Sequence, residues 1–318
     1  MKIVLPVFGG LIVALGSLQA SPTAYVSNFN GDTVSVIDVA TNTITTTITV
    51  EDRPYGMAFA PKSATVYLAN RDTNSVSIIN ALNNTVTGTI AVGNTPKFLA
   101  ITPDGTKIYV TNTLDETVSV IDVSTSTVIA TIPIGFGYAP EQLIITPNGV
   151  KAFVVNTGIN KVSVISVATD TVIDTFNVDS SPSGIDILPD GTKVYVTNRN
   201  DDNVSVIDVA THTVDKTIPV GDNPRHVAFT PDGTKAYVTN ASDANVSVID
   251  VASETVTATI PVGNSPRHIA FSSDGVKAYI ANNSSGNVSV IDVATNSVTD
   301  TITVGNSPRY VIIFPSVK

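Results

Sequence analysis

A four-residue segment of the type Tyr-Val-Thr-Asn occurs seven times along this chain, at intervals of 42, 42, 44, 42, 42 and 42 residues. Three further short runs rich in Val, Ile and Thr accompany each copy, and turn-forming residues separate these runs. β-Branched residues favour strands, and a four-stranded unit repeated at this period is typical of one propeller blade. The seven segments are residues 25–28, 67–70, 109–112, 153–156, 195–198, 237–240 and 279–282.

The first repeat lacks the strand that begins with proline in every other copy, and a matching segment follows the last repeat at residues 308–314. An open ring would expose two unpaired sheet edges. We therefore predict an all-β fold: a single seven-bladed β-propeller of four-stranded antiparallel blades over residues 21–318, closed by the C-terminal strand, which completes the first blade. The first blade combines residues 24–50 with 307–315, and the other blades begin at residues 54, 96, 140, 182, 224 and 266.

The N-terminal segment differs in composition from the repeats. Lys2 is followed by an apolar run over residues 3–15 and by Ala20 after a short polar stretch, as in a secretory signal peptide. The apolar run is shorter than the roughly 20 residues that a membrane-spanning helix needs. We predict a signal peptide at residues 1–20, a mature protein without a transmembrane anchor, and a location outside the cell, at its surface or in the periplasm.

The two ends of the predicted blades differ in how strictly they repeat. With the strands named A to D from the axis outward, the A–B and C–D turns are nearly identical between copies, and we call their side the repetitive face. The B–C loops and the D–A crossovers vary, and we call their side the variable face. Recognition requires local differences, so we place function on the variable face. The B–C loops are residues 29–32, 71–74, 113–116, 157–160, 199–202, 241–244 and 283–286.

The basic residues divide between these faces. All six arginines fall in the variable face, whereas five lysines occupy one repeated position at the start of strand B, where we interpret them as solubilising charge. These lysines are Lys107, Lys151, Lys193, Lys235 and Lys277. His212, in a C–D turn, is interpreted as a solvated surface residue.

Composition excludes several kinds of chemistry. The net charge of −10 disfavours a nucleic-acid binder, which needs a basic field, and the absence of cysteine excludes disulfides and thiolate catalysis. No hydrolase, metalloprotease, phosphate-loop or dinucleotide motif is present, and three histidines offer little material for acid–base catalysis. We therefore expect a monomer with no catalytic residue, no cofactor and no metal site.

The mouth of the propeller axis holds the candidate ligand-binding residues. The two residues after each strand-A proline are expected to project there, and blades six, seven and one are neighbours. Arg225, Arg267 and Arg309 then form a cationic arc suited to an anion. Beside the arc or further round the ring lie His226, His268, Tyr310, Lys97 and Glu141.

Two alternatives to this interpretation stay open. The arginines can pack over neighbouring loops and pair with local carboxylates such as Asp222, and His226 and His268 can act with Glu141 as metal ligands. Asp186 also belongs to the candidate set, because it interrupts strand A where other copies have Ala or Ile. It is either an acid with a perturbed pKa or a carboxylate facing a water-filled channel.

The Tyr-Val-Thr-Asn segments, the Pro-Asp-Gly-Thr-Lys turns and the Val-Ser-Val-Ile-Asp-Val runs resemble those of the YVTN-repeat β-propellers. That family includes surface-layer-type propellers and exported bacterial propellers. The resemblance covers residues 24–315 and implies an exported seven-bladed propeller. It carries no catalytic residue, because the shared motifs are structural.

These observations favour a non-enzymatic binding module that presents its variable face and axial mouth to a protein, a glycan or a small anionic ligand. The alternatives are a propeller enzyme of the lactonase or lyase kind with its site in the axial mouth, and a single-stranded nucleic-acid binder, which the acidic charge disfavours.

Cleavage of the signal peptide is directly testable. Protein recovered outside the cytoplasm should begin near Ser21 when its intact mass is measured. An exported protein that still carries Lys2 would contradict the prediction.

Overall fold

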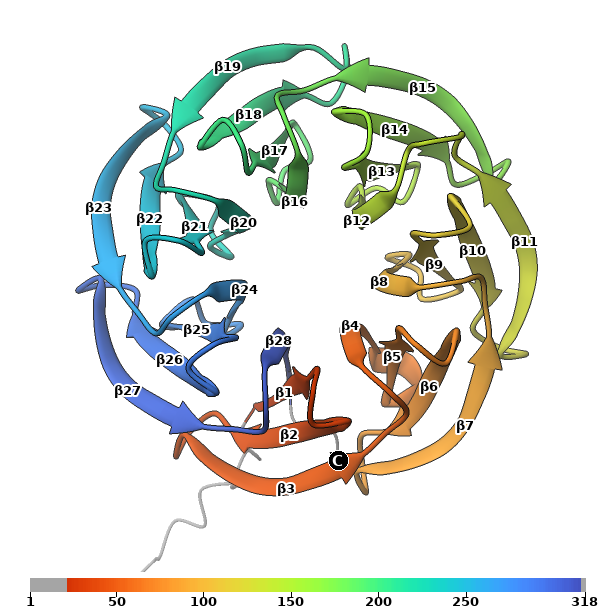
Figure 1. Ribbon diagram of the computed structural model, residues 1–318, viewed down its shortest axis with the longest axis horizontal. Coiled ribbons are helices and arrows are strands. Elements are labelled where there is room, and N and C mark those ends of the chain that lie inside the picture. Colours follow the sequence, from red (N-terminus) through yellow and green to blue (C-terminus); the bar gives the residue numbers. More distant parts are fainter. Residues whose placement is uncertain (1–21, 316–318) are drawn as a thin grey trace, which may run out of the picture.

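The computed structural model describes residues 22–315, so the predicted signal peptide lies outside the described residues. Within this range the chain forms seven four-stranded sheets arranged as blades around one axis (Figure 1). Neighbouring strands in each blade are antiparallel, and the only helical element described is the short 3-10 helix η1, Pro61–Ser63. No helix in the described part of the chain is long and apolar enough to cross a membrane.

Each blade contributes one strand to each of four concentric positions. The innermost strands, A, are β4 Pro54–Ala60, β8 Pro96–Ile101, β12 Pro140–Ile145, β16 Pro182–Ile187, β20 Pro224–Phe229, β24 Pro266–Phe271 and β28 Pro308–Phe314. The B strands are β1 Thr23–Asn28, β5 Thr65–Asn70, β9 Lys107–Asn112, β13 Lys151–Asn156, β17 Lys193–Asn198, β21 Lys235–Asn240 and β25 Lys277–Asn282.

The two outer positions follow the same order. The C strands are β2 Thr33–Asp38, β6 Ser75–Asn80, β10 Thr117–Asp122, β14 Lys161–Ser166, β18 Asn203–Asp208, β22 Asn245–Asp250 and β26 Asn287–Asp292. The outermost strands, D, are β3 Thr43–Thr49, β7 Thr85–Ala91, β11 Thr127–Pro133, β15 Thr171–Asn177, β19 Val214–Pro219, β23 Thr255–Pro261 and β27 Ser297–Thr303.

The ring closes between the last strand and the first. Strand β28 pairs antiparallel with β1, with Val26 opposite Val311 and Tyr25 opposite Ile312. In Figure 1 the blue β28 lies beside the red β1 and completes a sheet in the order β28-β1-β2-β3. The predicted fold class is confirmed, including closure of the first blade by the C-terminal strand.

The B strands connect each blade to the C–D turn of the next. The Tyr237 hydroxyl donates a hydrogen bond to Asn296 Oδ1 at 2.6 Å, and the Lys235 ammonium donates to the Val293 carbonyl at 3.2 Å. Lys277 does the same with the Val39 carbonyl at 2.8 Å, across the closure of the ring. The interpretation of these lysines as generic solubilising charge is therefore wrong, because their ammonium groups bond the neighbouring blade.

His212 is also placed differently from the expectation that it is solvated. Its side chain is only 12% exposed, its Nδ1 contacts Asp174, and its ring stacks on Phe176 with the centroids 5.9 Å apart. Its Nε2 lies 2.9 Å from the ammonium of Lys151, the strand-B lysine of the preceding blade. His212 thus fills the same interblade joint that Asn and Asp side chains fill elsewhere.

The A strands do not pair with one another, so side chains accept some of their free N–H groups. The Gln142 amide oxygen accepts from Ile185 N at 3.4 Å, and His226 Nδ1 accepts from Ile269 N at 3.4 Å. Asp186 accepts from Phe229 N of the next blade at 2.9 Å and from Ile187 N at 2.9 Å. Burial raises the pKa of Asp186 to about 6, although both N–H donors favour its charged form.

Removal of the closing strand is expected to be severely destabilising. A chain that ends at Val304 loses β28 and with it the buried Val311 and Phe314 and the half-buried Ile313. Burial of each such side chain contributes roughly 1.5–3 kcal/mol, and the sum approaches the whole net stability of a typical protein. Thermal melting of the truncated and the full-length chain should show the loss. Equal melting temperatures for the two chains would contradict ring closure.

Asp186 should make stability depend on pH in a defined direction. Its pKa is raised on folding from 3.8 to about 6, so its contribution is fully present below about pH 4 and is lost as the pH rises through 6. Asp186→Asn removes the buried charge. Relative to wild type, the variant should gain about 2 kcal/mol of unfolding free energy between pH 4 and pH 7. Urea unfolding at both pH values measures this, and a difference that does not change with pH would contradict it.

Candidate axial binding site

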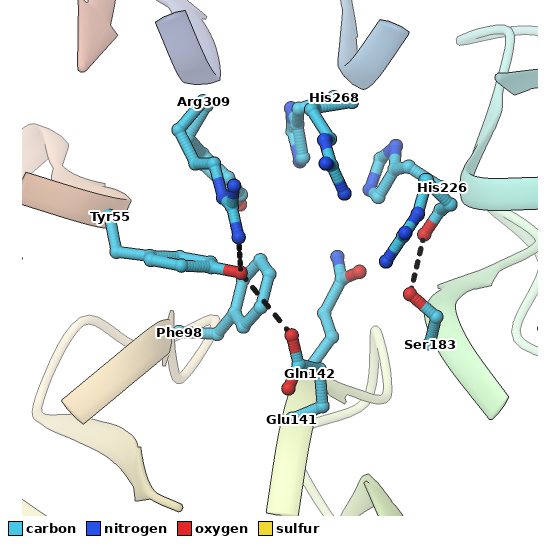
Figure 2. Close-up of a pocket in the computed structure, with 11 residues that line it drawn as sticks. Tyr55, Phe98, Glu141, Gln142, Ser183, His226, His268 and Arg309 are labelled. Carbon is cyan, nitrogen blue, oxygen red and sulfur yellow. Dashed lines mark hydrogen bonds between the residues drawn. The ribbon is translucent and has the colours of Figure 1, made fainter. Parts of the chain in front are cut away.

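The axial mouth on the variable face is a narrow cavity of about 30 Å³, formed by the first residues of the A strands. In Figure 2, Arg309, Tyr55 and Glu141 lie on one side, and Ser183 and His226 lie on the other. The cavity residues are Tyr55, Phe98, Glu141, Gln142, Ser183, Arg225, His226, Arg267, His268, Arg309 and Tyr310.

Hydroxyl groups of the repeated motif hold the backbone of these residues. The motif threonine on one blade donates to the carbonyl of the mouth residue on the next: Thr111 Oγ1 to Glu141 O at 2.7 Å and Thr239 Oγ1 to Arg267 O at 2.9 Å. Ser183 Oγ donates to Arg225 O at 3.1 Å. The repeat that builds the blades therefore also fixes the positions of the side chains at the mouth.

Glycine after the mouth residue allows adjacent A strands to approach closely. A Cβ at Gly184 would lie 2.6 Å from the Arg225 carbonyl oxygen, and a Cβ at Gly56 would lie 2.6 Å from that of Lys97. Such distances are far below van der Waals contact. Glycine at these two positions thus keeps the neighbouring blades, and the side chains of Arg225 and Lys97, in place.

The three arginines of the arc line the cavity together. Arg309 Nη2 donates to the Tyr55 hydroxyl at 2.8 Å, while the Nε atoms of Arg225 and Arg267 are buried without a hydrogen-bond partner. Among the ion pairs of residues 22–315, none involves Arg225, Arg267 or Arg309. Burial, together with the neighbouring guanidiniums, lowers the pKa of Arg225 to about 9 and that of Arg267 to about 10.

One carboxylate faces the arc, and it already has a partner. Glu141 forms an ion pair with Lys97, and both side chains are 17% exposed. The Tyr55 hydroxyl donates to Glu141 Oε1 at 3.3 Å and so connects Glu141 to Arg309. Burial opposes the charge of Glu141, but the Lys97 ammonium and more distant arginines outweigh it and lower the pKa of this carboxyl.

Two histidines and a tyrosine form a stack in the cavity wall. The ring centroids of His226 and His268 are 3.8 Å apart, and those of His268 and Tyr310 are 3.5 Å apart. Burial lowers the pKa of His226 to about 3, and burial next to His226 holds the pKa of His268 well below its usual value. Both imidazoles are therefore neutral at physiological pH, and the arginines supply the positive charge of the site.

The structure brings most of the predicted residues together. Seven line one cavity, and Lys97 joins them through its ion pair with Glu141. Asp186 is not among the lining residues, because its carboxylate bonds backbone N–H groups between blades. In the described part of the chain, no group of three or more His, Asp or Glu side chains is arranged to hold a metal ion.

Four further lining residues follow strand-A prolines and are therefore expected at the mouth, but they are not among the candidate ligand-binding residues: Tyr55, Phe98, Gln142 and Ser183. Phe29 has no such signal: it lies in a B–C loop, yet its ring contacts three arginine side chains.

Several solved structures superimpose on nearly the whole chain. A protein of unknown function from Desulfotomaculum acetoxidans has a TM-score of 0.80 at 17% identity, covering 92% of this chain and 99% of its own. A putative 6-phosphogluconolactonase from Bacteroides fragilis has a TM-score of 0.79 at 18% identity, covering 94% and 99%. Hydrazine synthase from Kuenenia stuttgartiensis has a TM-score of 0.78 at 23% identity, covering 90% and 99%. At these identities the likeness extends to the fold alone.

Sequence comparison gives a more specific assignment. No curated protein matches the chain. Residues 80–259, more than half of the 318-residue chain, match the family described as "Lactonase, 7-bladed beta-propeller". With its closed ring of seven four-stranded blades, the chain belongs to this family of seven-bladed lactonase propellers.

Proposed function

We propose that the protein binds small anionic molecules, carboxylates foremost, at the mouth of its narrow axial cavity, with Arg225, Arg267 and Arg309 as the recognition groups. One observation carries the proposal: three arginines line one cavity, and none has a carboxylate partner among the described residues. Glu141, the nearest carboxylate in the cavity, is engaged by Lys97.

The electrostatic balance of the cavity supports an anionic ligand. Partly burying a cation without a counter-ion costs free energy, and the lowered pKa values of Arg225 and Arg267 reflect that cost. An anion between the guanidiniums would offset their mutual repulsion and accept charge-assisted hydrogen bonds. A guanidinium presents a fork of N–H donors that suits carboxylate and phosphate. The protein as a whole carries a charge of −10, so the attraction must be local.

The proposal includes the setting in which the protein acts. The N-terminal segment of signal-peptide type and the resemblance to YVTN-repeat propellers both support an exported protein that acts as a binding module at the cell surface or in the periplasm. The variable loops around the mouth are then the surface that a protein, glycan or small ligand meets.

A second candidate function, hydrolysis of a lactone, is favoured by the family to which the chain belongs. Lactone opening needs a base that takes a proton from water and a cation that stabilises the oxyanion formed at the carbonyl. Glu141 is the ionised carboxylate of the cavity, although its ion pair with Lys97 lowers its pKa and makes it a weak base, and Arg309 is linked to it through Tyr55. His226 and His268 are poorly suited to the role of base, because their buried imidazoles resist protonation.

Replacing the central arginine of the arc should weaken anion binding. Arg267→Ala removes one charge-assisted contact, so binding of citrate, phosphate or galacturonate should weaken by roughly 1.5–3 kcal/mol. The effect should shrink at high salt, where exposed charges are screened. Isothermal titration calorimetry on wild type and variant measures both.

Lys235→Ala is the matched control, because it removes a cation from the repetitive face and leaves the cavity intact. Its affinities should equal those of wild type. Equal responses from the two variants, or no binding by wild type, would leave the arginines as loop scaffolding and overturn the proposal.

The lactonase candidate is tested separately through Glu141. Glu141→Gln keeps the shape of the side chain but removes the base, so hydrolysis of a sugar lactone should fall by roughly 10²–10⁴-fold while anion binding persists. A pH-stat assay corrected for spontaneous hydrolysis measures the rate. Equal rates for wild type, variant and buffer would exclude catalysis and leave a binding protein.

A further inference from the structure

The arginines continue beyond the axial cavity. Arg309 contacts two aromatic rings, with its guanidinium carbon 4.6 Å from the Tyr55 centroid and 5.0 Å from the Phe29 centroid. The guanidinium carbons of Arg53 and Arg71 lie 5.4 and 5.8 Å from the same Phe29 ring. The Phe29 ring thus contacts three arginines. Through it, the axial arc continues to Arg53 and Arg71 at the rim of the variable face near blades one and two.

Charge at this rim is only partly neutralised. Asp72 pairs with Arg53 at 3.3 Å and lies 3.9 Å from Arg71, so one carboxylate serves two cations. Both arginine side chains are substantially exposed, at 47% and 34%. They can therefore contact a partner that crosses the rim.

On the other side of the mouth a polar groove leaves the axial cavity. The groove and the cavity share Arg225, and the groove wall adds Arg199, Asn200, Asn223 and Ser242. Arg199 Nη2 donates to Ser181 Oγ at 2.7 Å, and its Nε donates to Ser181 O at 3.3 Å, which fixes the guanidinium over the groove. The charge of Arg199 acts on both Arg225 and Arg267.

All six arginines of the chain therefore form one band across the variable face. It runs from the rim over the axial mouth into the groove through Arg71, Arg53, Arg309, Arg267, Arg225 and Arg199. A single small anion contacts only the central part of this band. A chain of regularly spaced anions can contact its whole length, because multivalent binding adds the separate contacts.

We infer that this arginine band binds an extended acidic polysaccharide whose repeating units are uronates, with one unit at the axial cavity and its neighbours on the rim and in the groove. This inference rests on the proposed anion site at the axis and extends it. Carboxylates at intervals along a sugar chain fit guanidinium forks, and sugar hydroxyls fit the amide and hydroxyl groups of the groove.

A single-stranded nucleic acid fits this surface less well. Such ligands need open aromatic faces for base stacking. The Phe29 ring contacts three guanidinium groups, and Tyr55 contacts Arg309, Phe98 and Phe29, so both rings are already engaged by protein side chains. The groove also holds the carboxylates of Asp202 and Asp222, which repel a phosphate backbone and a uronate chain alike, so base stacking is the property that separates the two ligands.

The test compares galacturonate oligomers of one, two, three and six units, with neutral maltohexaose and a six-nucleotide oligothymidylate as comparators. Affinities are measured by calorimetry for wild type, Arg71→Ala, Arg199→Ala and the control Lys216→Ala, which removes a cation from the outer strand β19. Affinity should rise about tenfold or more from one unit to six. Arg71→Ala should weaken binding of the galacturonate hexamer about two- to fivefold, as expected for loss of an exposed ion pair, and should leave binding of the single unit unchanged.

Failure of the inference is distinguishable from failure of the axial site. Binding of the monomer that does not strengthen with length, or a hexamer affinity unchanged by Arg71→Ala and Arg199→Ala, would overturn the arginine band and keep the axial site. Absence of binding by every oligomer would overturn both. Tighter binding of oligothymidylate than of the galacturonate hexamer would show that the ligand is not a polysaccharide. Maltohexaose that binds as tightly as the galacturonate hexamer would show that charge is not what the surface recognises. Melting temperatures equal to that of wild type confirm that the variants are folded.

Discussion

The ladder of hydrogen bonds between β28 and β1 turns seven separate sheets into a ring, and the site depends on it. Arg309 and Tyr310 lie on β28, so the same pairing that closes the first blade places a cation and an aromatic ring at the axial mouth. The partners of Arg309 come from the other end of the chain: Tyr55 lies on β4 and Phe29 follows β1. Strand β28 thus both closes the ring and positions Arg309 at the mouth. The positions of Arg225 and Arg267 depend only on blades that are consecutive in the chain.

Interblade contacts show how a repeat can support a site that does not repeat. The motif residues Tyr and Lys bond the turn of the next blade on the repetitive face, and the motif Thr bonds the backbone of the next mouth residue on the variable face. The backbone at the mouth is therefore fixed by the repeat, while the side chain that it presents is free to differ. Tyr, Lys, Glu, Ser and Arg occupy equivalent positions in different blades. The arginines accumulate in three adjacent blades, where they repel one another because no carboxylate separates them.

The fold could be predicted almost completely because its determinants are local and repeat seven times. The axial arc could also be predicted, since the residue after the strand-A proline lines the cavity in six of the seven blades. Other contacts could not. Phe29 meets Arg71 and Arg309 only after two loops and strand β28 come together, and no spacing in the sequence encodes that meeting. From the sequence, a lone carboxylate in strand A suggests an active-site acid. In the structure, the Asp186 carboxylate instead accepts a hydrogen bond from Phe229 N on the unpaired edge of β20. The sequence also gives no sign that the lysines at the start of strand B bond a carbonyl of the next blade, as Lys235 does with Val293 O.

The position of β28 in the order of synthesis has a consequence for how the protein is made. Blades two to seven each consist of consecutive strands and can form as the chain emerges, but the first blade waits for residues 308–314. Pairing β1 with β28 joins segments separated by nearly the whole chain, and such contacts form late and slowly. Until then β1 is an unpaired edge, exposed to pairing with another copy. Because Arg309 reaches the mouth in the same step, an anion held by all three arginines can stabilise only the finished ring, and it would favour completion of folding over misassembly.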